Sequence, residues 1–251
     1  MKRNIVLDCD PGHDDAVAIL LAGKNPNLNL LGISVVAGNQ TIEKTARNAL
    51  NVATFLGINV PIAIGCEFPM VRERVICAAI HGESGLDGFE FPNYGDKFDK
   101  RHGVQLIIDS VMNNDKVTIV ATGPLTNVAM AIKMEPKILE RLDEIVIMGG
   151  SVDNGNTSPA AEFNIMCDPE AAHVVFSSGV TVRMVGLNVT RKVTDRPNSL
   201  RHNRSCHRSI SRTRVLIRWE YAVPVRSLSQ GTGSRGLHRC LPSWSHAHRG
   251  T

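Results

Sequence analysis

Leu7-Asp-Cys-Asp-Pro-Gly-His-Asp-Asp-Ala16 is the most informative stretch of this sequence. It begins at the end of an apolar run, residues 5–7, that is typical of a buried strand. Pro11-Gly12 then turns the chain, and the residues that follow fit the first turn of a helix. The stretch therefore predicts a strand that passes directly into a helix.

Four acids crowd into this junction, namely Asp8, Asp10, Asp14 and Asp15. Strand alternation places Asp8 and Asp10 on one face. Converging carboxylates raise one another's pKa unless a cation joins them, and all-oxygen ligands favour Ca²⁺ or Mg²⁺. The alternative is that Asp14 and Asp15 only complement the positive end of the helix, which explains two of the four acids.

Outward from this junction, residues 1–194 alternate apolar runs with helical patterns, as βαβ units on a parallel sheet do. The apolar runs are 5–7, 30–36, 60–64, 117–121, 145–148 and 181–185. Helical patterns lie at about 14–23, 41–57, 103–114, 125–134 and 168–178, with caps expected at Thr41, Thr126 and Asp168. The pattern predicts an α/β fold with an open, mostly parallel, doubly wound sheet that binds ligands at the carboxyl ends of its strands.

The net charge of +4 hides two unlike parts. Residues 1–194 hold 17 Lys and Arg against 22 Asp and Glu, whereas residues 195–251 hold 11 Arg, no Lys and only two acids. We therefore expect an α/β domain over residues 1–193 and a basic, Arg/Ser/His-rich tail over residues 194–251. In the tail, only 215–219 and 221–225 could form short strands.

The composition of the tail leaves two interpretations open. Arg without Lys, together with abundant Ser, His and Trp, is typical of translation in a shifted reading frame. The other interpretation is a genuine, disordered tail. Nucleic-acid binding is not favoured, because the Arg residues have no helical spacing and no RNA-binding motif is present.

Other features indicate a cytoplasmic protein. No apolar run approaches the roughly 18 residues of a membrane helix. An acid follows only three apolar residues at the N-terminus, too few for a secretory signal. Six cysteines without a C-x-x-C pair do not suggest a disulfide scaffold.

Further motifs follow the acidic junction in order along the chain. They are Val36-Ala-Gly-Asn-Gln-Thr41, Ile80-His-Gly-Glu-Ser-Gly-Leu-Asp-Gly88, Thr122-Gly-Pro-Leu-Thr-Asn127, Ile147-Met-Gly-Gly150, Ala161-Glu-Phe-Asn-Ile165 and Asp168-Pro-Glu-Ala-Ala172. Together with the junction, this series resembles the inosine-uridine preferring nucleoside hydrolases, which split the N-glycosidic bond of ribonucleosides. The resemblance runs from about residue 3 to residue 192.

The resemblance implies a Ca²⁺ held by Asp10, Asp15 and the main-chain carbonyl of Thr122. The ion would take the ribose 2′- and 3′-hydroxyls and one water. Asp10 would act as the general base, and the water would attack C1′ as the ribosyl group gains oxocarbenium character.

The resemblance also assigns the remaining site residues. Those implied to hold or line the ribose are Asp14, Asn39, Met148, Glu162 and Asn164, and His81 would lie near the base and assist its departure. The implied substrate is a ribonucleoside of the inosine, uridine and cytidine class, in nucleoside salvage. The match around His81 leans towards pyrimidines, and homo-oligomers are common in the family.

Without the resemblance, the same residues also allow purely structural interpretations. Asn39 could be a turn residue after Gly38, and His81 could be a loop histidine. Glu162 and Asn164 alternate along what reads as an extended segment, so they could bind only backbone.

The chain departs from the family pattern near its end. The family carries a late His-Asp pair whose Asp completes the Ca²⁺ site, and no His-Asp dipeptide follows residue 192. Losing a ligand and a charge weakens a Ca²⁺ site. We therefore expect weak metal affinity and little or no activity from the chain as given.

Two rival functions remain at this stage. Asp8-x-Asp10 at a strand end also suits a haloacid-dehalogenase-like phosphatase, with Asp8 as nucleophile and Asp10 as acid. That class requires a later paired-acid motif, and this sequence has Gly149-Gly150 after its strand instead. The second rival is non-catalytic: a dead, truncated relative, or one whose basic tail binds nucleic acid.

Overall fold

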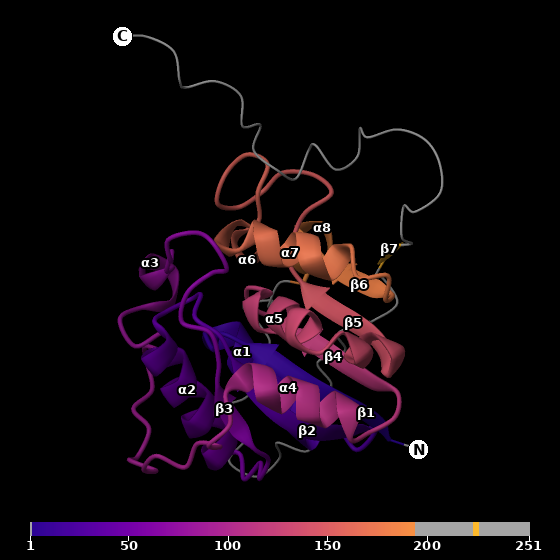
Figure 1. Cartoon of the computed structure of the whole chain (residues 1–251). Helices are drawn as coiled ribbons and strands as arrows, with labels where there is room; N and C mark the ends of the chain where they lie inside the picture. The colour runs from indigo at the N-terminus through magenta and orange to yellow at the C-terminus, as the bar shows by residue number, and fades with distance from the viewer. Residues whose placement is uncertain (1, 194–222, 226–251) are drawn as a thin grey trace, which may run out of the picture.

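A seven-stranded sheet forms the middle of the molecule in the computed structural model, which describes residues 2–193 and 223–225 (Figure 1). The strands are β1 (Arg3–Cys9), β2 (Leu28–Val35), β3 (Ile62–Ile64), β4 (Val117–Ala121), β5 (Leu142–Met148), β6 (Val182–Val185) and β7 (Val223–Val225). They lie in the order β3-β2-β1-β4-β5-β6-β7, parallel except for β7, which runs antiparallel to β6. The predicted open, mostly parallel sheet is confirmed.

The strand expected within residues 221–225 is β7. The one expected at 215–219 lies outside the described residues, as does the rest of the predicted basic tail over 194–251.

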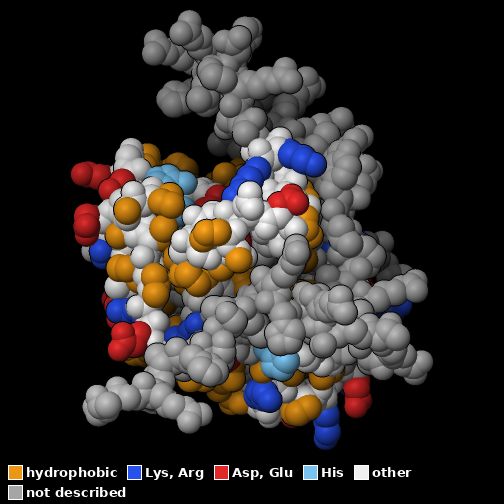
Figure 2. All heavy atoms as spheres, turned by 90° about the horizontal axis from the view of Figure 1, so that it is seen from above, with side chains coloured by type: hydrophobic (Ala, Val, Ile, Leu, Met, Phe, Trp, Pro, Cys, Tyr) orange, Lys and Arg blue, Asp and Glu red, His pale blue; other side chains and the backbone are white. Residues whose placement is uncertain are grey.

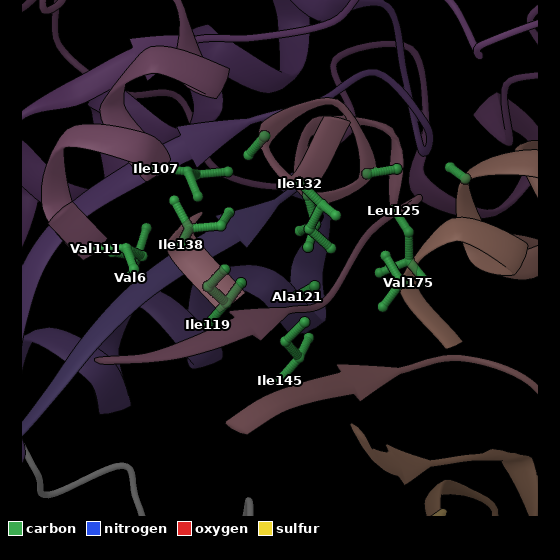
Figure 3. Close-up of a cluster of buried hydrophobic side chains, with 14 of the residues drawn as sticks. Val6, Ile107, Val111, Ile119, Ala121, Leu125, Ile132, Ile138, Ile145 and Val175 are labelled. Carbon is green, nitrogen blue, oxygen red and sulfur yellow. The ribbon is translucent and has the colours of Figure 1, made fainter. Parts of the chain in front are cut away.

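Helices cover both faces of the sheet, as a doubly wound fold requires. They are α1 (His13–Lys24), α2 (Ile42–Phe55), α3 (Ala78–His81), α4 (Gly103–Met112), α5 (Thr126–Met134), α6 (Phe163–Cys167), α7 (Pro169–Phe176) and α8 (Leu187–Thr190), with a 3₁₀ helix at Pro136–Glu140. Alternation along β1 separates two cores: Ile5 and Leu7 pack with α1 and α2, whereas Val6 packs with α4, α5 and α7. Figure 3 shows the second of these cores around Val6, Ile119 and Leu125.

Some local expectations were wrong. The N-cap of α5 is Leu125 rather than Thr126, whose hydroxyl donates to Asp168 Oδ2 at 2.7 Å instead. Thr41 precedes α2 as predicted, but its side chain makes no capping hydrogen bond. The Asp168 cap is confirmed, since its Oδ1 accepts from the Ala171 N–H at 3.0 Å.

The strand order creates a switch point between β1 and β4. From β1 the chain builds outward through β2 and β3, and it then returns to the other side of β1 with β4. Asp8 pairs with Ala121 in the register of these two strands, so Asp10 and Thr122 leave the sheet beside each other. A crevice at such a point is where open α/β sheets bind their ligands.

Several apolar side chains remain exposed in the long segment between β3 and α4, among them Val71 at 76% and Ile80 at 74%. Figure 2 shows hydrophobic side chains grouped on the described surface in the view from above.

Across residues 2–193 and 223–225, no helix combines the length and the apolar character needed to cross a membrane.

Candidate active site

Asp10 and Asp15 approach each other across the turn between β1 and α1, and both side chains are buried. Asn39, which follows β2, links them. Its main-chain N–H donates to Asp10 Oδ2 at 2.7 Å, and its Nδ2 donates to Asp15 Oδ2 at 3.4 Å and to the Asp10 carbonyl at 3.1 Å. Asn39 therefore belongs to the acidic site and is more than a turn residue.

Thr122 joins this pair from the end of β4. Its Oγ1 donates to Asp15 Oδ1 at 2.5 Å, and its main-chain N–H donates to the Asp8 carbonyl at 2.8 Å. Its own carbonyl accepts from Asn164 Nδ2 at 2.9 Å. The structure thus brings together the three residues that the resemblance implies as metal ligands.

Two glycines leave room for the Asp10 carboxylate. A Cβ atom at Gly38 would lie 2.2 Å from Asp10 Oδ2, and one at Gly123 would lie 2.5 Å from Asp10 Oδ1. Asp10 Oδ1 is buried and has no hydrogen-bond partner among the described residues. Burying a carboxylate oxygen without a partner costs free energy, so a bound cation or donor at this atom would be stabilising.

Burial dominates the electrostatics of the acidic pair. It raises the pKa of Asp10 well above its usual range, and the neighbouring Asp15 carboxylate raises that pKa further. It also raises the pKa of Asp15 to about 7, with Asp14 adding to the effect. A hard divalent cation would relieve the repulsion between two such carboxylates.

The acidic site supplies two carboxylates and one main-chain carbonyl. Within the described part of the chain, no group of three or more His, Cys, Asp or Glu side chains is placed to hold a metal. The expectation that four acids converge was therefore wrong. Asp14 is exposed on α1, and the fully buried Asp8 accepts from Asn127 Nδ2 at 2.9 Å instead.

Met148, Glu162 and Asn164 lie at the end of β5 and the start of α6, and Asn164 connects them to Thr122 of the acidic site. Asn164 Nδ2 also donates to the Met148 carbonyl at 3.1 Å. Glu162 caps α6, and its Oε2 accepts from the N–H groups of Gly150 at 2.9 Å and Ile165 at 3.1 Å. An extended segment was wrongly expected here, because Asn164 lies in the first turn of α6. Burial raises the pKa of Glu162.

His81 is the last residue of α3, and its ring lies against Gly12 in the turn between β1 and α1. A Cβ atom at Gly12 would lie 2.4 Å from His81 Nδ1, which is buried without a hydrogen-bond partner in the described part. The His81 ring stacks on His13, with centroids 6.0 Å apart and planes 20° apart. Burial lowers the pKa of His81. The structure therefore places His81 against the acidic turn, with its Nδ1 buried and the rest of its side chain half-buried.

Side chains at the start of and along α2 hold the segment that follows His81. Each donates to a main-chain carbonyl, and the pairs are Gln40–Gly82, Lys44–Glu83, Asn48–Ser84 and Arg47–Gly95. Asn48 also donates to the Pro11 carbonyl at 3.1 Å. These contacts were not predicted from the sequence, although polar residues at 40, 44 and 48 recur at the spacing of one helix face.

A cavity of about 1090 Å³ lies between α2 and residues 84–91, and none of the predicted site residues lines it.

Buried carboxylates at the switch point of a doubly wound sheet are typical of an α/β enzyme whose chemistry depends on acids at strand ends. Comparison with known families makes the class specific. The family described as inosine-uridine preferring nucleoside hydrolase matches residues 5–233, and the chain belongs to this family. The match continues past residue 192, where the motifs found in the sequence end.

Individual relatives agree with this assignment. The pyrimidine-specific ribonucleoside hydrolase RihB of Escherichia coli K12 is 50% identical over 198 residues, which are 78% of this chain and 63% of RihB. A plant nucleoside hydrolase, PpNRh1, is 36% identical with a TM-score of 0.73, over 77% of this chain and 62% of its own. A purine-preferring ribonucleoside hydrolase from Gardnerella vaginalis is 35% identical with a TM-score of 0.77, over 81% and 66%. The chain thus spans about 63% of the length of the curated relatives it matches.

Proposed function

We propose that this chain carries the catalytic half-site of a ribonucleoside hydrolase, which splits the N-glycosidic bond to give ribose and a free base. The observation that carries the proposal is Asp10, buried beside Asp15 at the switch point with one oxygen that has no partner in the described residues. Membership of the nucleoside hydrolase family supports the same chemistry.

The donor set suits Ca²⁺, which accepts carboxylate and carbonyl oxygens in a flexible geometry. Asp10, Asp15 and the Thr122 carbonyl would hold the ion. When bound, Ca²⁺ would supply a docking point for the ribose diol and would make a coordinated water more acidic.

The chain's own residues divide the remaining work. Asp10, kept in place by the Asn39 N–H, would take the proton of the attacking water. Asp14, Asn39, Glu162 and Asn164 would hold ribose hydroxyls, and Met148 would line the sugar pocket. Contacts to the sugar accelerate the reaction to the extent that they strengthen as the ring flattens towards the oxocarbenium ion.

His81 is proposed to face the departing base. Its Nδ1 has no partner in the described residues, so it can donate to or accept from a base nitrogen or oxygen. The relatives named above include both pyrimidine-specific and purine-preferring enzymes. We favour pyrimidine ribonucleosides, with uridine and cytidine ahead of inosine, because RihB shares the higher identity.

The surroundings of Asp8 argue against the phosphatase alternative. In that mechanism Asp8 would attack phosphorus, yet its side chain is fully buried and hydrogen-bonded to Asn127. A nucleophile must reach its substrate, so Asp8 cannot fill this role in the described geometry.

The protein is proposed to act in the cytoplasm. Residues 193–251 contain no His-Asp dipeptide of the kind the family carries late in its sequence, so these residues are proposed to give weak Ca²⁺ binding and slow turnover. The test measures ribose released from uridine, cytidine and inosine with added Ca²⁺ or with a chelator. We expect slow release that needs Ca²⁺ and is lost in Asp10→Asn. Phosphate release from phosphoesters without ribose release would overturn the proposal, and fast turnover would overturn the expected weakness.

A further inference from the structure

One buried amide joins three strand ends beside the acidic site. Asn127, in the first turn of α5, is fully buried. Its Nδ2 carries two hydrogens, which are shared among three acceptors: Asp8 Oδ1 at 2.9 Å, Ser34 Oγ at 3.0 Å and the Val35 carbonyl at 3.0 Å. Its Oδ1 accepts from the Cys66 N–H at 2.8 Å. The amide therefore links α5 to β1, to β2 and to the chain just after β3.

The fit around this amide is tight and directional. A Cβ atom at Gly65 would lie 2.4 Å from both Oδ1 and Nδ2 of Asn127. Because Oδ1 faces an N–H group and Nδ2 faces oxygens, the amide has only one satisfied orientation. A leucine at position 127 would make none of these hydrogen bonds, and an aspartate would have no donor for Asp8.

The contacts of Asn127 reach both segments that carry the acidic site. Asp8 lies two residues before Asp10, and Asn127 lies in the first turn of α5, just after the connection that begins at Thr122. The Asn127–Asp8 hydrogen bond spans 119 positions of sequence and ties the end of β1 to the connection after β4. The acidic pair and the Thr122 carbonyl therefore sit on two segments joined through this bond.

We propose that Asn127 and Asp8 form a positioning pair that holds Asp10 and the Thr122 carbonyl at the separation a bound cation requires. Asp8 is thus an anchor for Asn127, not a ligand. This inference rests on the proposed function, because it concerns the same cation site.

The first test measures Ca²⁺ affinity of the full chain by calorimetry. Asn127→Leu and Asp8→Leu are expected to weaken Ca²⁺ binding at least tenfold, whereas Asp8→Asn, which keeps the Oδ1 acceptor, stays within about threefold of wild type. The control is Ile138→Ala or Ile138→Val, whichever lowers Tm as much as Asn127→Leu does. Ile138 is fully buried in the core away from the acidic residues. Equal loss of Ca²⁺ affinity in the Ile138 control would overturn the proposal.

The second test needs no metal. The Asn39 N–H donates to Asp10 Oδ2, so its hydrogen exchange reports how firmly Asp10 is held. Hydrogen exchange at the Asn39 N–H should be at least tenfold faster in Asn127→Leu than in the Ile138 control. Equal exchange rates would overturn the proposal that Asn127 positions Asp10. If wild type binds no Ca²⁺, the proposed function loses its support while this exchange experiment still decides the role of Asn127. Should Asn127→Leu fail to fold, Asn127→Ser is measured in its place.

Discussion

The buried Asp15 carboxyl makes the metal-free protein sensitive to pH in a defined direction. Burial raises the pKa of Asp15 from 3.8 to about 7, so between these values the folded chain keeps a proton that the unfolded chain loses. Asp15 therefore lowers the free energy of unfolding as pH rises through this window, and Asp8 and Asp10, whose pKa values burial also raises, add losses of the same sign. The shift corresponds to a loss on the order of 4 kcal/mol.

Asp15→Asn removes this titration together with the repulsion that the Asp15 carboxylate exerts on Asp10. The variant should be more stable than wild type at pH 8 without Ca²⁺. The amide of the Asp15→Asn variant has one acceptor oxygen fewer than the carboxylate for the Gly12 and Asn39 donors. This loss offsets roughly 1–3 kcal/mol of the stability gained by removing the charge. A net gain of about 2 kcal/mol is expected at pH 8, and none at pH 4, where Asp15 is protonated in the folded chain.

Urea denaturation at pH 4, 6 and 8 with a Ca²⁺ chelator measures these differences. Glu140→Gln is the matched control, because it removes the same charge from an exposed side chain at the end of the 3₁₀ helix, away from the acidic pair. Its effect should stay within about 0.5 kcal/mol. Added Ca²⁺ should restore stability to wild type at pH 8 and not to Asp15→Asn. If metal-free wild type is as stable at pH 8 as at pH 4, and Asp15→Asn gains nothing, the reasoning from burial is refuted.

Three further predictions concern single contacts. Asp168→Ala removes a fully buried carboxylate that accepts three hydrogen bonds, and should lower the free energy of unfolding by about 3 kcal/mol in urea, with Asp168→Asn in between. Gly38→Ala places a Cβ 2.2 Å from Asp10 Oδ2, so Ca²⁺ should no longer raise its Tm; an unchanged Tm response would contradict the tight fit. Glu162→Ala should cost about 1 kcal/mol of stability through the lost cap of α6, whereas Glu162→Gln, which keeps an acceptor, should cost less.

The sheet was predictable because its strands are buried on both faces. Such strands read as continuous apolar runs, and the run at 117–121 coincides with β4. The helices α3 and α6 were missed, since four or five residues are too few to show a helical period.

The residue types of the acidic site were predictable, but the orientation of the Asp8 side chain was not. The four acids at a strand-to-helix junction indicated a cation site, and the resemblance selected Asp10, Asp15 and Thr122. That Asp8 turns to Asn127 depends on a contact between distant segments, which one sequence does not display. A partial signal existed: Asp8 shares the strand face of Val6, and that face packs against α4 and α5.

The way α2 holds the segment after His81 has a consequence for how the protein can diverge. The four donors Gln40, Lys44, Arg47 and Asn48 all contact main-chain carbonyls between Gly82 and Gly95. A carbonyl is present whatever side chain its residue bears. Side chains in this segment can therefore be exchanged while its attachment persists, so the surface that the segment presents can vary on a constant framework.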